Sequence, residues 1–535
     1  MTFKKNGYIL PVVLLIIVFL SLSTVFFVRQ TAQSSTLSTY DDAMTLAKID
    51  AENALALATY QFTDLLASIG RVDPSQAESR LSNALNNMNW STPEENATIT
   101  ATIRPDSIVK QTDSTGQVRS FSAIVDIQST GEVHGQKAKR IESYRVSTIA
   151  NLFQFSIYTP GTLELNGAPY IQGDLYVGEN LVTRNCAKYI YSGNRTQFTA
   201  FPYVNGMFAY GKKDATFIIN QSKSNSCQGK DTSISTDRLN EGFSENGTPQ
   251  LIRPKGIRYT TIDVRALYDQ WNNIEGNYPQ FCSEKDWRGR CIESVLKNDS
   301  ITFLPSDPLS PGITVDKVNL KNSNVNIYGD LVVKGDMTLE NTTLTLLDRN
   351  GKPSSQGKII VRGNLSLTNS EINGVVYVGG TAQLEGDIRT NSTLYVVGSV
   401  TMEGMTNSKK GSTLVIVADG DIQVANNNLY EDTPQTVPAF LYSNRTLSIY
   451  GVGSHLKIVG GIYGSNIMLS AVKGNTKKNC SWLSCSLTFD SGQLSLPPER
   501  ARLQVVFSED MIQNPPDGIY QPGELTSKRI DSRWE

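Results

Sequence analysis

An uncharged apolar run from Tyr8 to Val28 constrains this chain more than any other feature of its sequence. Its 21 residues would span about 30 Å as an α-helix, which matches the hydrocarbon core of a bilayer. Lys4 and Lys5 precede the run, Arg29 closes it, and no second run of this kind follows. The sequence therefore predicts a single-pass membrane helix, with everything after it on one side of the membrane.

Three kinds of N-terminal segment contain such a run. A cleaved secretory signal needs a shorter apolar core and a small-residue cleavage site, and residues 30–33 form a poor one. A signal anchor fits both the length and the basic flank, which the positive-inside rule keeps in the cytoplasm. A prepilin leader would end at Gly7 and be cut before Tyr8, and Pro11 is tolerated so early in a helix.

The sequence beyond the membrane predicts that the helix continues. Residues 30–69 contain no proline and no glycine, and strong helix formers become frequent from Ala43 onward. Apolar residues recur at three- and four-residue spacings, which makes one apolar stripe for packing on a soluble domain. The pattern allows a break over residues 34–39, and Gly70 is a natural stop.

The N-terminal region resembles that of PilX-type minor pilins of type IV pilus systems, on the segments NGYILPVVLLIIVFLSLSTVFF and AKIDAENALALATYQF. In that family an alanine-rich helix with an A-E-x-A-L core follows the leader helix, and Ala51–Leu55 matches that core. The resemblance covers residues 1–70 and implies cleavage between Gly7 and Tyr8 and association with other pilin-like subunits. Val12 stands where major pilins carry Glu, which argues against a major subunit. An ordinary anchor with a helical stalk is the alternative.

A pilin-like α+β domain is expected over residues 29–150. A second helix should run from Pro74 to about Met88, with Asp73 as its cap. Three runs alternate apolar and polar residues and predict antiparallel strands, namely Asn96–Arg104, Val118–Gln128 and Val133–Ser147. A long helix followed by an antiparallel meander is the pilin arrangement, after a leader at 1–7 and a membrane helix at 8–28.

From residue 151 the chain reads as all-β. Short apolar triplets recur after Gly and Asp, Asn or Ser, at Gly173–Val177, Gly329–Val333, Gly335–Leu339, Gly363–Leu367, Gly398–Met402 and Gly420–Val424, with a variant at Gly386–Ile388. Such corners turn the backbone, and the residues after them alternate inward and outward. Stacked corners predict a right-handed parallel β-helix-like solenoid over 151–188 and 301–496. The irregular period leaves a β-sandwich as the alternative.

The remaining segments and the cysteines complete the expected domain plan. Residues 189–300 interrupt the repeats as an insertion with a short helix at Thr261–Trp271, and residues 497–535 supply a strand at Leu503–Phe507 and a mobile tail. The six cysteines are Cys186, Cys227, Cys282, Cys291, Cys480 and Cys485. An even number outside the membrane suggests disulfides, and sequence proximity favours Cys282–Cys291 and Cys480–Cys485, leaving Cys186 with Cys227.

Composition and motifs favour a structural role over catalysis. The net charge of −2 gives no electrostatic footprint for nucleic acid, and no Cys-x-x-Cys pair or histidine cluster suggests a metal or another cofactor. His134 and His455 lie in strand patterns, far apart in sequence. The four corner carboxylates that could be imagined as a glycosidase or calcium cluster repeat at one motif position, which favours local turns; they are Asp330, Asp336, Asp387 and Asp421.

Aromatic residues of the insertion admit two interpretations, a sugar-binding surface or the insertion's own core, and the core is favoured. They are Tyr189, Tyr191, Phe198, Phe201, Tyr203, Phe208 and Tyr210. The sequence thus predicts a non-enzymatic, single-pass membrane protein, exposed outside the cytoplasm at the cell surface or in a pilus. It would act as a minor-pilin-like subunit whose ectodomain meets a surface polysaccharide or a host ligand. The competing hypothesis is a surface-anchored β-helical enzyme or binding protein for polysaccharide.

Overall fold

A computed structural model describes most of the chain as two compact units. Unit 1 comprises Met1–Ile108, Ser122–Val146 and Ser527–Glu535, and unit 2 comprises Val109–Phe121 and Ser147–Thr526. The described residues are 9–92, 96–112, 116–190, 194–211, 216–223, 227–252, 261–272, 278–297, 302–303, 311–354, 356–390, 393–406, 413–480, 485–509 and 518–535. Unit 1 therefore takes its residues from before and after unit 2 in the chain.

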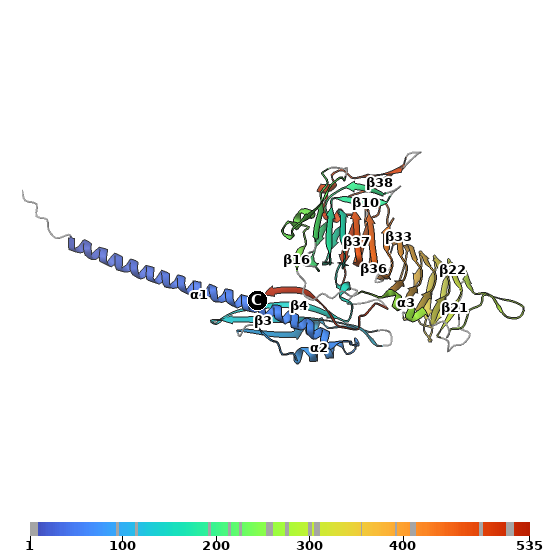
Figure 1. The fold of residues 1–535 in the computed structure, drawn as a ribbon, viewed down its shortest axis with the longest axis horizontal. Helices are drawn as coiled ribbons and strands as arrows, with labels where there is room; N and C mark the ends of the chain where they lie inside the picture. Colours follow the sequence, from blue (N-terminus) through green and yellow to red (C-terminus); the bar gives the residue numbers. More distant parts are fainter. Residues whose placement is uncertain are drawn as a thin grey trace, which may run out of the picture. The chain divides into compact units, whose positions relative to one another are not determined.

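Unit 1 is built on a single helix, α1 (Ile9–Ile69), which runs without interruption (Figure 1). Its 61 residues make a rod of about 90 Å. The break allowed over residues 34–39 does not occur. The hydroxyls of Thr36 and Thr39 instead donate to backbone carbonyls one turn back, at 2.8 and 2.9 Å, so these polar side chains are satisfied within the helix.

The second half of α1 buries one face within unit 1. The buried residues are Ala43, Ala47, Ala51, Ala54, Leu55, Ala58, Phe62 and Leu66, which follow the predicted apolar stripe. Alanines on this face let the backbones come close. At Gly131 in β3 (Val118–Val133), a Cβ atom would lie 2.2 Å from the carbonyl oxygen of Ala47. Only glycine fits there, so Gly131 fixes how closely the helix and the sheet pack.

The strands of unit 1 lie in one sheet in the order β1, β3, β4 and β41, and β2, whose residues are counted in unit 2, pairs with β3. Their bounds are β1 (Ala97–Ile103), β2 (Val109–Thr112), β4 (Gln136–Ser147) and β41 (Thr526–Trp534). Strands β1 and β3 are antiparallel, with Ile103 opposite Val125. The tail expected to be mobile therefore supplies a sheet strand over nine of its residues. The sequence of β41 lacks the alternation of apolar and polar residues that predicts a strand, because the strand is largely solvated and carries charged side chains.

Helix α2 (Ala77–Asn86) is shorter than the expected span from Pro74 to Met88. The carboxylate of Asp73 accepts hydrogen bonds from the backbone N–H and the hydroxyl of Ser75, at 2.8 and 2.5 Å. Asp73 thus closes a turn before the helix instead of capping its first residue. Short polar side chains compete with helical hydrogen bonds in this way, which explains the later start.

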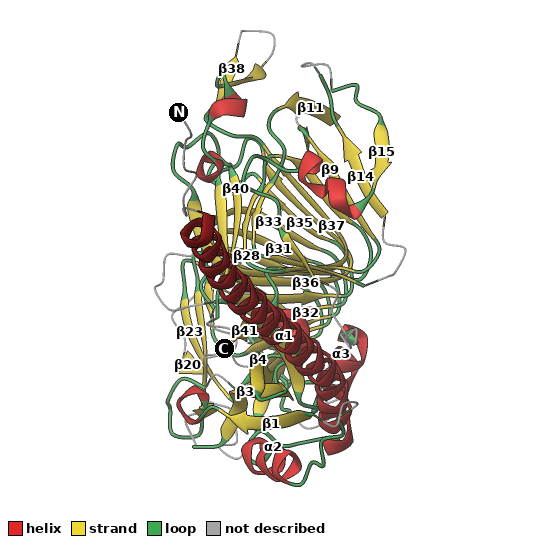
Figure 2. Ribbon diagram, turned by 90° about the vertical axis from the view of Figure 1, so that its left-hand side faces the viewer, coloured by secondary structure: helices red, strands yellow, loops and turns green. Residues whose placement is uncertain are grey.

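Unit 2 stacks parallel strands in columns, each strand pairing with the next coil of the chain (Figure 2). The first column is β21 (Gly312–Val315), β24 (Asp330–Val333), β27 (Lys358–Val361), β30 (Val375–Val378), β32 (Thr393–Val396) and β34 (Leu414–Ala418). The second is β19 (Val295–Lys297), β22 (Lys317–Lys321), β25 (Met337–Glu340), β28 (Leu365–Thr368), β31 (Ala382–Asp387), β33 (Val400–Thr406) and β35 (Ile422–Ala425). A shorter third column is β20 (Thr302–Phe303), β23 (Asn324–Tyr328), β26 (Thr343–Leu347) and β29 (Glu371–Ile372).

Both long columns end on β36 (Gln435–Gly451), which pairs in parallel with β37 (Leu456–Ala471). The coils that come earlier in the sequence continue the stack from β37. They contain β5 (Ile157–Thr159), β6 (Leu163–Gly167), β8 (Leu175–Val177), β9 (Asn180–Arg184), β13 (Met207–Tyr210) and β14 (Thr216–Asn220). A third side is formed by β40 (Leu503–Phe507), β7 (Tyr170–Gln172) and β12 (Tyr203–Asn205).

This order corrects the expected boundaries of the insertion. Strands β12, β13 and β14 stack on β7, β8 and β9, so the coils extend to Asn220 instead of stopping at residue 188. Further along, β16 (Gln250–Ile252) stacks in parallel on β13, and β15 (Asp231–Ile234) pairs antiparallel with β14. Helix α3 (Val264–Asn272) lies close to the expected helix. Stacked coils confirm a strand-rich unit of parallel strands, whereas the right hand of the coils stays a prediction.

Three glycine corners that the sequence singles out, Gly363, Gly398 and Gly420, form a ladder along the stack together with Gly380. The N–H groups of Gly363, Gly380, Gly398 and Gly420 each donate to the carbonyl of the glycine one coil earlier, at 2.9 to 3.1 Å. A Cβ atom on Gly398 would lie 2.5 Å from the carbonyl oxygen of Gly380. Glycine is required here because the backbones of successive coils touch.

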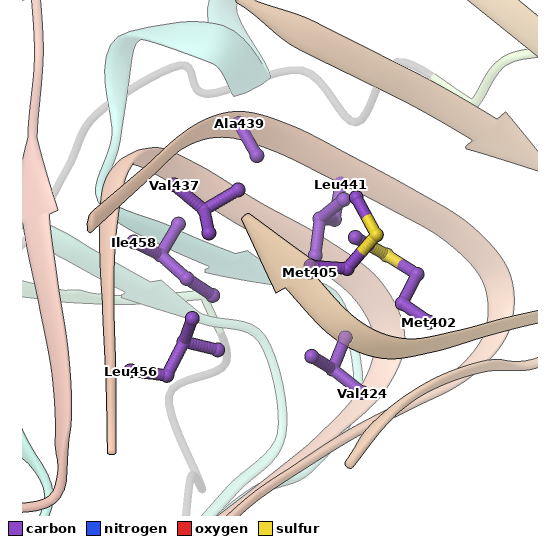
Figure 3. Close-up of a pocket in the computed structure, with 8 residues that line it drawn as sticks. All are labelled: Met402, Met405, Val424, Val437, Ala439, Leu441, Leu456 and Ile458. Atoms are coloured by element: carbon purple, nitrogen blue, oxygen red, sulfur yellow. The ribbon is translucent and has the colours of Figure 1, made fainter. Parts of the chain in front are cut away.

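The core of unit 2 is a continuous column of aliphatic side chains contributed by one coil after another. Near its middle, a small void of about 10 Å³ is left between β33, β35, β36 and β37 (Figure 3). Its lining is wholly apolar and consists of Met402, Met405, Val424, Val437, Ala439, Leu441, Leu456 and Ile458. A void of this kind offers water no hydrogen-bond partner and stays dry.

Candidate functional site

The first half of α1 exposes a continuous apolar surface. Val12, Leu15 and Phe19 are 55%, 70% and 67% exposed. Among the residues that the structure describes, α1 is the single helix long and apolar enough to cross a membrane. Water makes so much exposed apolar surface unfavourable, so this half of α1 needs lipid or other apolar helices around it.

Polar groups within this apolar half are satisfied internally. The hydroxyl of Ser21 donates to the carbonyl of Ile17 at 2.8 Å, and that of Thr24 donates to the carbonyl of Leu20 at 2.7 Å. An unsatisfied hydroxyl in hydrocarbon would cost several kcal/mol. The two side chains are therefore compatible with a lipid environment.

A buried polar network anchors the second half of α1 to the sheet. Glu142 in β4 is the centre of this network and is 7% exposed. Its carboxylate accepts hydrogen bonds from Thr59 of α1 at 3.3 Å, Tyr144 of β4 at 2.6 Å and Arg529 of β41 at 2.8 Å. Burial, together with the Glu142 carboxylate, raises the pKa of Tyr144 far above its usual value, so its hydroxyl remains a donor. The network joins three elements of unit 1.

The expected cleavage position lies outside this description. Gly7 and Tyr8 are not among the described residues, and cleavage between them stays a prediction.

The six cysteines pair within unit 2 as Cys186–Cys227, Cys282–Cys291 and Cys480–Cys485. These are the pairs that proximity in the sequence favours. Two of them close short loops, with sequence separations of 9 and 5 positions, and the third has a separation of 41 positions.

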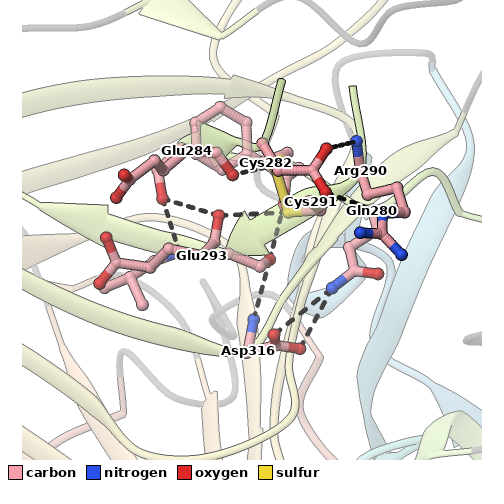
Figure 4. Close-up of a disulfide and its surroundings, with 12 residues drawn as sticks. Gln280, Cys282, Glu284, Arg290, Cys291, Glu293 and Asp316 are labelled. Atoms are coloured by element: carbon pink, nitrogen blue, oxygen red, sulfur yellow. Dashed lines mark hydrogen bonds and ion pairs between the residues drawn. A yellow bond between two sulfur atoms is a disulfide. The ribbon is translucent and has the colours of Figure 1, made fainter. Parts of the chain in front are cut away.

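The Cys282–Cys291 bond closes a hairpin formed by β17 (Glu284–Lys285) and β18 (Cys291–Glu293) (Figure 4). At its turn, the Asp286 carboxylate accepts the backbone N–H groups of Arg288 and Arg290, at 2.9 and 2.8 Å. Trp287 lies in this turn and is 85% exposed. The turn thus places a large aromatic side chain in solvent.

Each of the four corner carboxylates has a hydrogen-bond or ion-pair partner in unit 2. Asp330, Asp336 and Asp421 each accept a backbone N–H from the following coil, at 2.7, 2.7 and 3.0 Å. Asp387 binds the guanidinium of Arg389 at 2.6 Å. Within the described parts of the chain, no group of three or more His, Cys, Asp or Glu residues could hold a metal ion. Asp330, Asp336 and Asp421 therefore hold successive coils together, instead of closing the local turns that the sequence suggested.

The two histidines lie in different units. His134 is exposed in the turn between β3 and β4, with φ of 48°. His455 is 5% exposed, and its Nδ1 lies 3.0 Å from the carbonyl of Glu431. Burial, together with the nearby Arg502 and Arg500, lowers the pKa of His455 to about 4, so it is neutral at physiological pH.

The aromatic residues of the expected insertion lie in different places in the structure and do not form one cluster among the described residues. Phe208 is buried in the coil core, and Tyr203 stacks on Tyr170 with ring centroids 5.4 Å apart. Tyr189 packs edge-on against Phe489 at 6.1 Å. Tyr191 lies outside the described residues.

Tyr189 also lines a cleft of about 540 Å³. The cleft lies between the hairpin of β10 (Cys186–Ile190) and β11 (Asn194–Phe198) and outward-facing residues of β36 and β37. The other lining residues are Lys188, Ile190, Asn194, Arg195, Thr196, Tyr450 and Met468. No local pattern could reveal this cleft, because about half the chain separates its two walls.

No protein-family model and no curated protein matches this chain. Among solved structures, one match is the crystal structure of the competence-associated pilin ComZ from Thermus thermophilus. It shares 12% sequence identity over 92% of this chain and 97% of that chain, with a TM-score of 0.28. A score this low supports no inference about fold or function for this chain.

Proposed function

We propose that this chain is a membrane-anchored, minor-pilin-like subunit that displays a coiled β ectodomain outside the cytoplasm as part of a type IV pilus-like assembly. The contrast between the two halves of α1 carries this proposal. One half has no internal partner for its apolar surface, and the other is docked on a sheet through Ala47, Ala51 and their neighbours. A helix of this design sits in lipid before assembly and packs among other apolar helices afterwards.

Maturation at the N-terminus provides the test. The full chain is expressed in membranes with and without a prepilin peptidase, and its N-terminus is determined by mass spectrometry. Processing should produce a mature end at Tyr8 only when the peptidase is present. A Gly7→Leu variant serves as the control and should remain uncut. An intact Met1 in the presence of active peptidase would refute the pilin proposal and leave a tethered β protein.

The proposed role is structural contact, without catalysis. Supporting it, the disulfide-closed hairpin holds Trp287 in solvent, with the guanidinium of Arg288 4.3 Å from its ring. Tryptophan and arginine are the residues that most often dominate binding energy at interfaces. Because an exposed side chain contributes little to folding, Trp287→Ala should leave stability unchanged while lowering attachment of cells that display the chain. The substitution Lys285→Ala on the same hairpin is the matched control. Equal attachment by the wild type, Trp287→Ala and Lys285→Ala would count against contact through this hairpin.

A further inference from the structure

The cleft beside β10 and β11 is preformed by contacts at the base of the hairpin and in the middle of β10. At the base, Cys186 is bonded to Cys227, and Asn185 exchanges two hydrogen bonds with Ser222, at 2.9 and 2.8 Å. Further along, the backbone N–H of Lys188 donates to the Ser470 hydroxyl of β37 at 2.6 Å, and that hydroxyl donates to the carbonyl of Lys188. The hairpin is therefore held over the stack instead of swinging freely.

The charge of the cleft favours an anion. Among the residues that the structure describes, eight line the cleft, and they include two cations and no carboxylate. Lys188 is already engaged, with its Nζ atom 3.2 Å from Glu164. Arg195 is exposed, and among the described residues its guanidinium forms no ion pair. A guanidinium free to make two parallel hydrogen bonds suits a carboxylate.

The other lining residues suit a sugar ring. Asn194 and Thr196 flank Arg195 in the exposed strand β11, where their side chains take the face opposite to that of Arg195 and its cross-strand partner Tyr189. Tyr450 and Met468 bring an aromatic ring and a flexible apolar side chain from the stack. Burial raises the pKa of Tyr450, so its phenol stays protonated and can donate a hydrogen bond. A volume near 540 Å³ lies within the usual range for small-molecule sites, about 300–1,000 Å³.

We propose that this cleft binds an acidic saccharide. The sugar carboxylate pairs with the guanidinium of Arg195, and the apolar face of the ring rests on Tyr450 and Met468. A simple anion would use only the cation, and an acidic peptide would make no use of the flat apolar surface. This proposal specifies a class of ligand for the contact role proposed above. It rests on that proposed function in one respect, namely that the cleft is exposed outside the cytoplasm.

Binding is measured by isothermal titration calorimetry on the full chain in detergent, so the result does not depend on assembly or on N-terminal processing. The probes are trigalacturonate, the neutral trisaccharide maltotriose and a triglutamate peptide. Trigalacturonate should bind roughly tenfold or more tightly than either of the others, the factor expected from one charge-assisted hydrogen bond combined with ring contact. Equal binding of triglutamate would overturn the saccharide assignment in favour of a site for anionic peptides.

Two variants locate the site. Arg195→Gln should weaken trigalacturonate binding roughly tenfold, and Tyr450→Ala should weaken both saccharides. Arg265→Gln removes the same charge from another exposed position, in α3, and should leave binding unchanged. Circular dichroism checks that each variant is folded. Undiminished affinity in Arg195→Gln, or no binding of trigalacturonate to the wild type, would overturn the proposal even if cleavage at Gly7 had been demonstrated.

Discussion

Arg529 of β41 donates to the buried carboxylate of Glu142 in β4, with 2.8 Å between Nη1 and Oε1. Glu142 also accepts from Thr59 in α1. A residue near one end of the sequence is therefore connected to the first helix through a single carboxylate. The consequences for the stability of unit 1 can be measured directly.

The Arg529→Met substitution should destabilise unit 1 by about 2 kcal/mol, because it leaves the Glu142 carboxylate buried with one charged partner fewer. Hydrogen exchange at the backbone amides of β4 and β41 measures the stability of unit 1 separately from that of unit 2. Arg533→Met removes an arginine from the same strand, where it pairs with Asp531 in a largely exposed position, and should cost less than about 0.5 kcal/mol. Equal exchange in the two variants would contradict a special role for Glu142.

The glycine ladder predicts a severe effect from a single methyl group. In Gly398→Ala, the new Cβ would lie 2.5 Å from the carbonyl oxygen of Gly380, so the two coils must separate. The expected loss is about 2 kcal/mol or more, seen as a lower thermal midpoint for unit 2. Gly453→Ala provides the control, because the nearest neighbour of its new Cβ atom would be a side-chain atom of Leu429 at 3.5 Å. A similar midpoint for both variants would show that the ladder tolerates side chains.

The void in Figure 3 makes the core sensitive to truncation. Leu441→Ala would enlarge an existing space of about 10 Å³ and should destabilise unit 2 by about 3 kcal/mol, from lost transfer energy and the larger cavity. Urea unfolding followed by circular dichroism measures the difference. Leu429→Ala, at a position that is 40% exposed, should cost less than about 1 kcal/mol. If the costs were the same, the core around Leu441 would have collapsed to fill the space.

Acid should weaken unit 2 through His455. The pKa of His455 is about 4 in the folded protein, below its ordinary value of 6.5, because of burial and of Arg502 and Arg500. Unfolding therefore takes up a proton between these two values, and stability falls as the pH drops from 6.5 to 4. The loss from this group approaches about 3 kcal/mol at pH 4.

A His455→Leu variant should lose that part of the pH dependence, and His134→Asn should keep it. The comparison isolates the histidine from carboxylates that titrate in the same range. Urea midpoints at pH 7, 5.5 and 4.5 are sufficient. Parallel pH profiles for the wild type and His455→Leu would contradict a buried neutral histidine.

Much of this architecture could be predicted from local patterns. The 3.6-residue periodicity of α1 continues past residue 40, so the soluble half of the helix and its buried face follow directly from Ala47, Ala51 and Phe62. Stacking is visible in the sequence because each coil places Gly and Asp at the same corner, where Asp336 and its equivalents clamp the next coil. Both features depend on residues close together in the sequence, so they produce periodic patterns of residue types.

Other features depend on contacts between distant residues and leave no such trace. Strand β41 contains charged residues throughout, so its sequence resembles a tail, although it pairs with β4. The same is true of the cleft, where Arg195 meets Tyr450 and Met468 only after the stack has formed. A left-handed asparagine marks a second series of corners, at Asn322, Asn341, Asn369 and Asn426. These asparagines are visible in the sequence, and they mark a corner of the coil other than the one that the glycines occupy.

Strand β41 is synthesised only after the whole of unit 2, and it occupies the edge of a sheet whose other strands were made several hundred residues earlier. Until those nine residues emerge, β4 presents an open edge and Glu142 lacks its arginine. Completion of unit 1 therefore waits until translation has passed through unit 2. A chain interrupted within unit 2 would keep α1 but carry a sheet without its last strand.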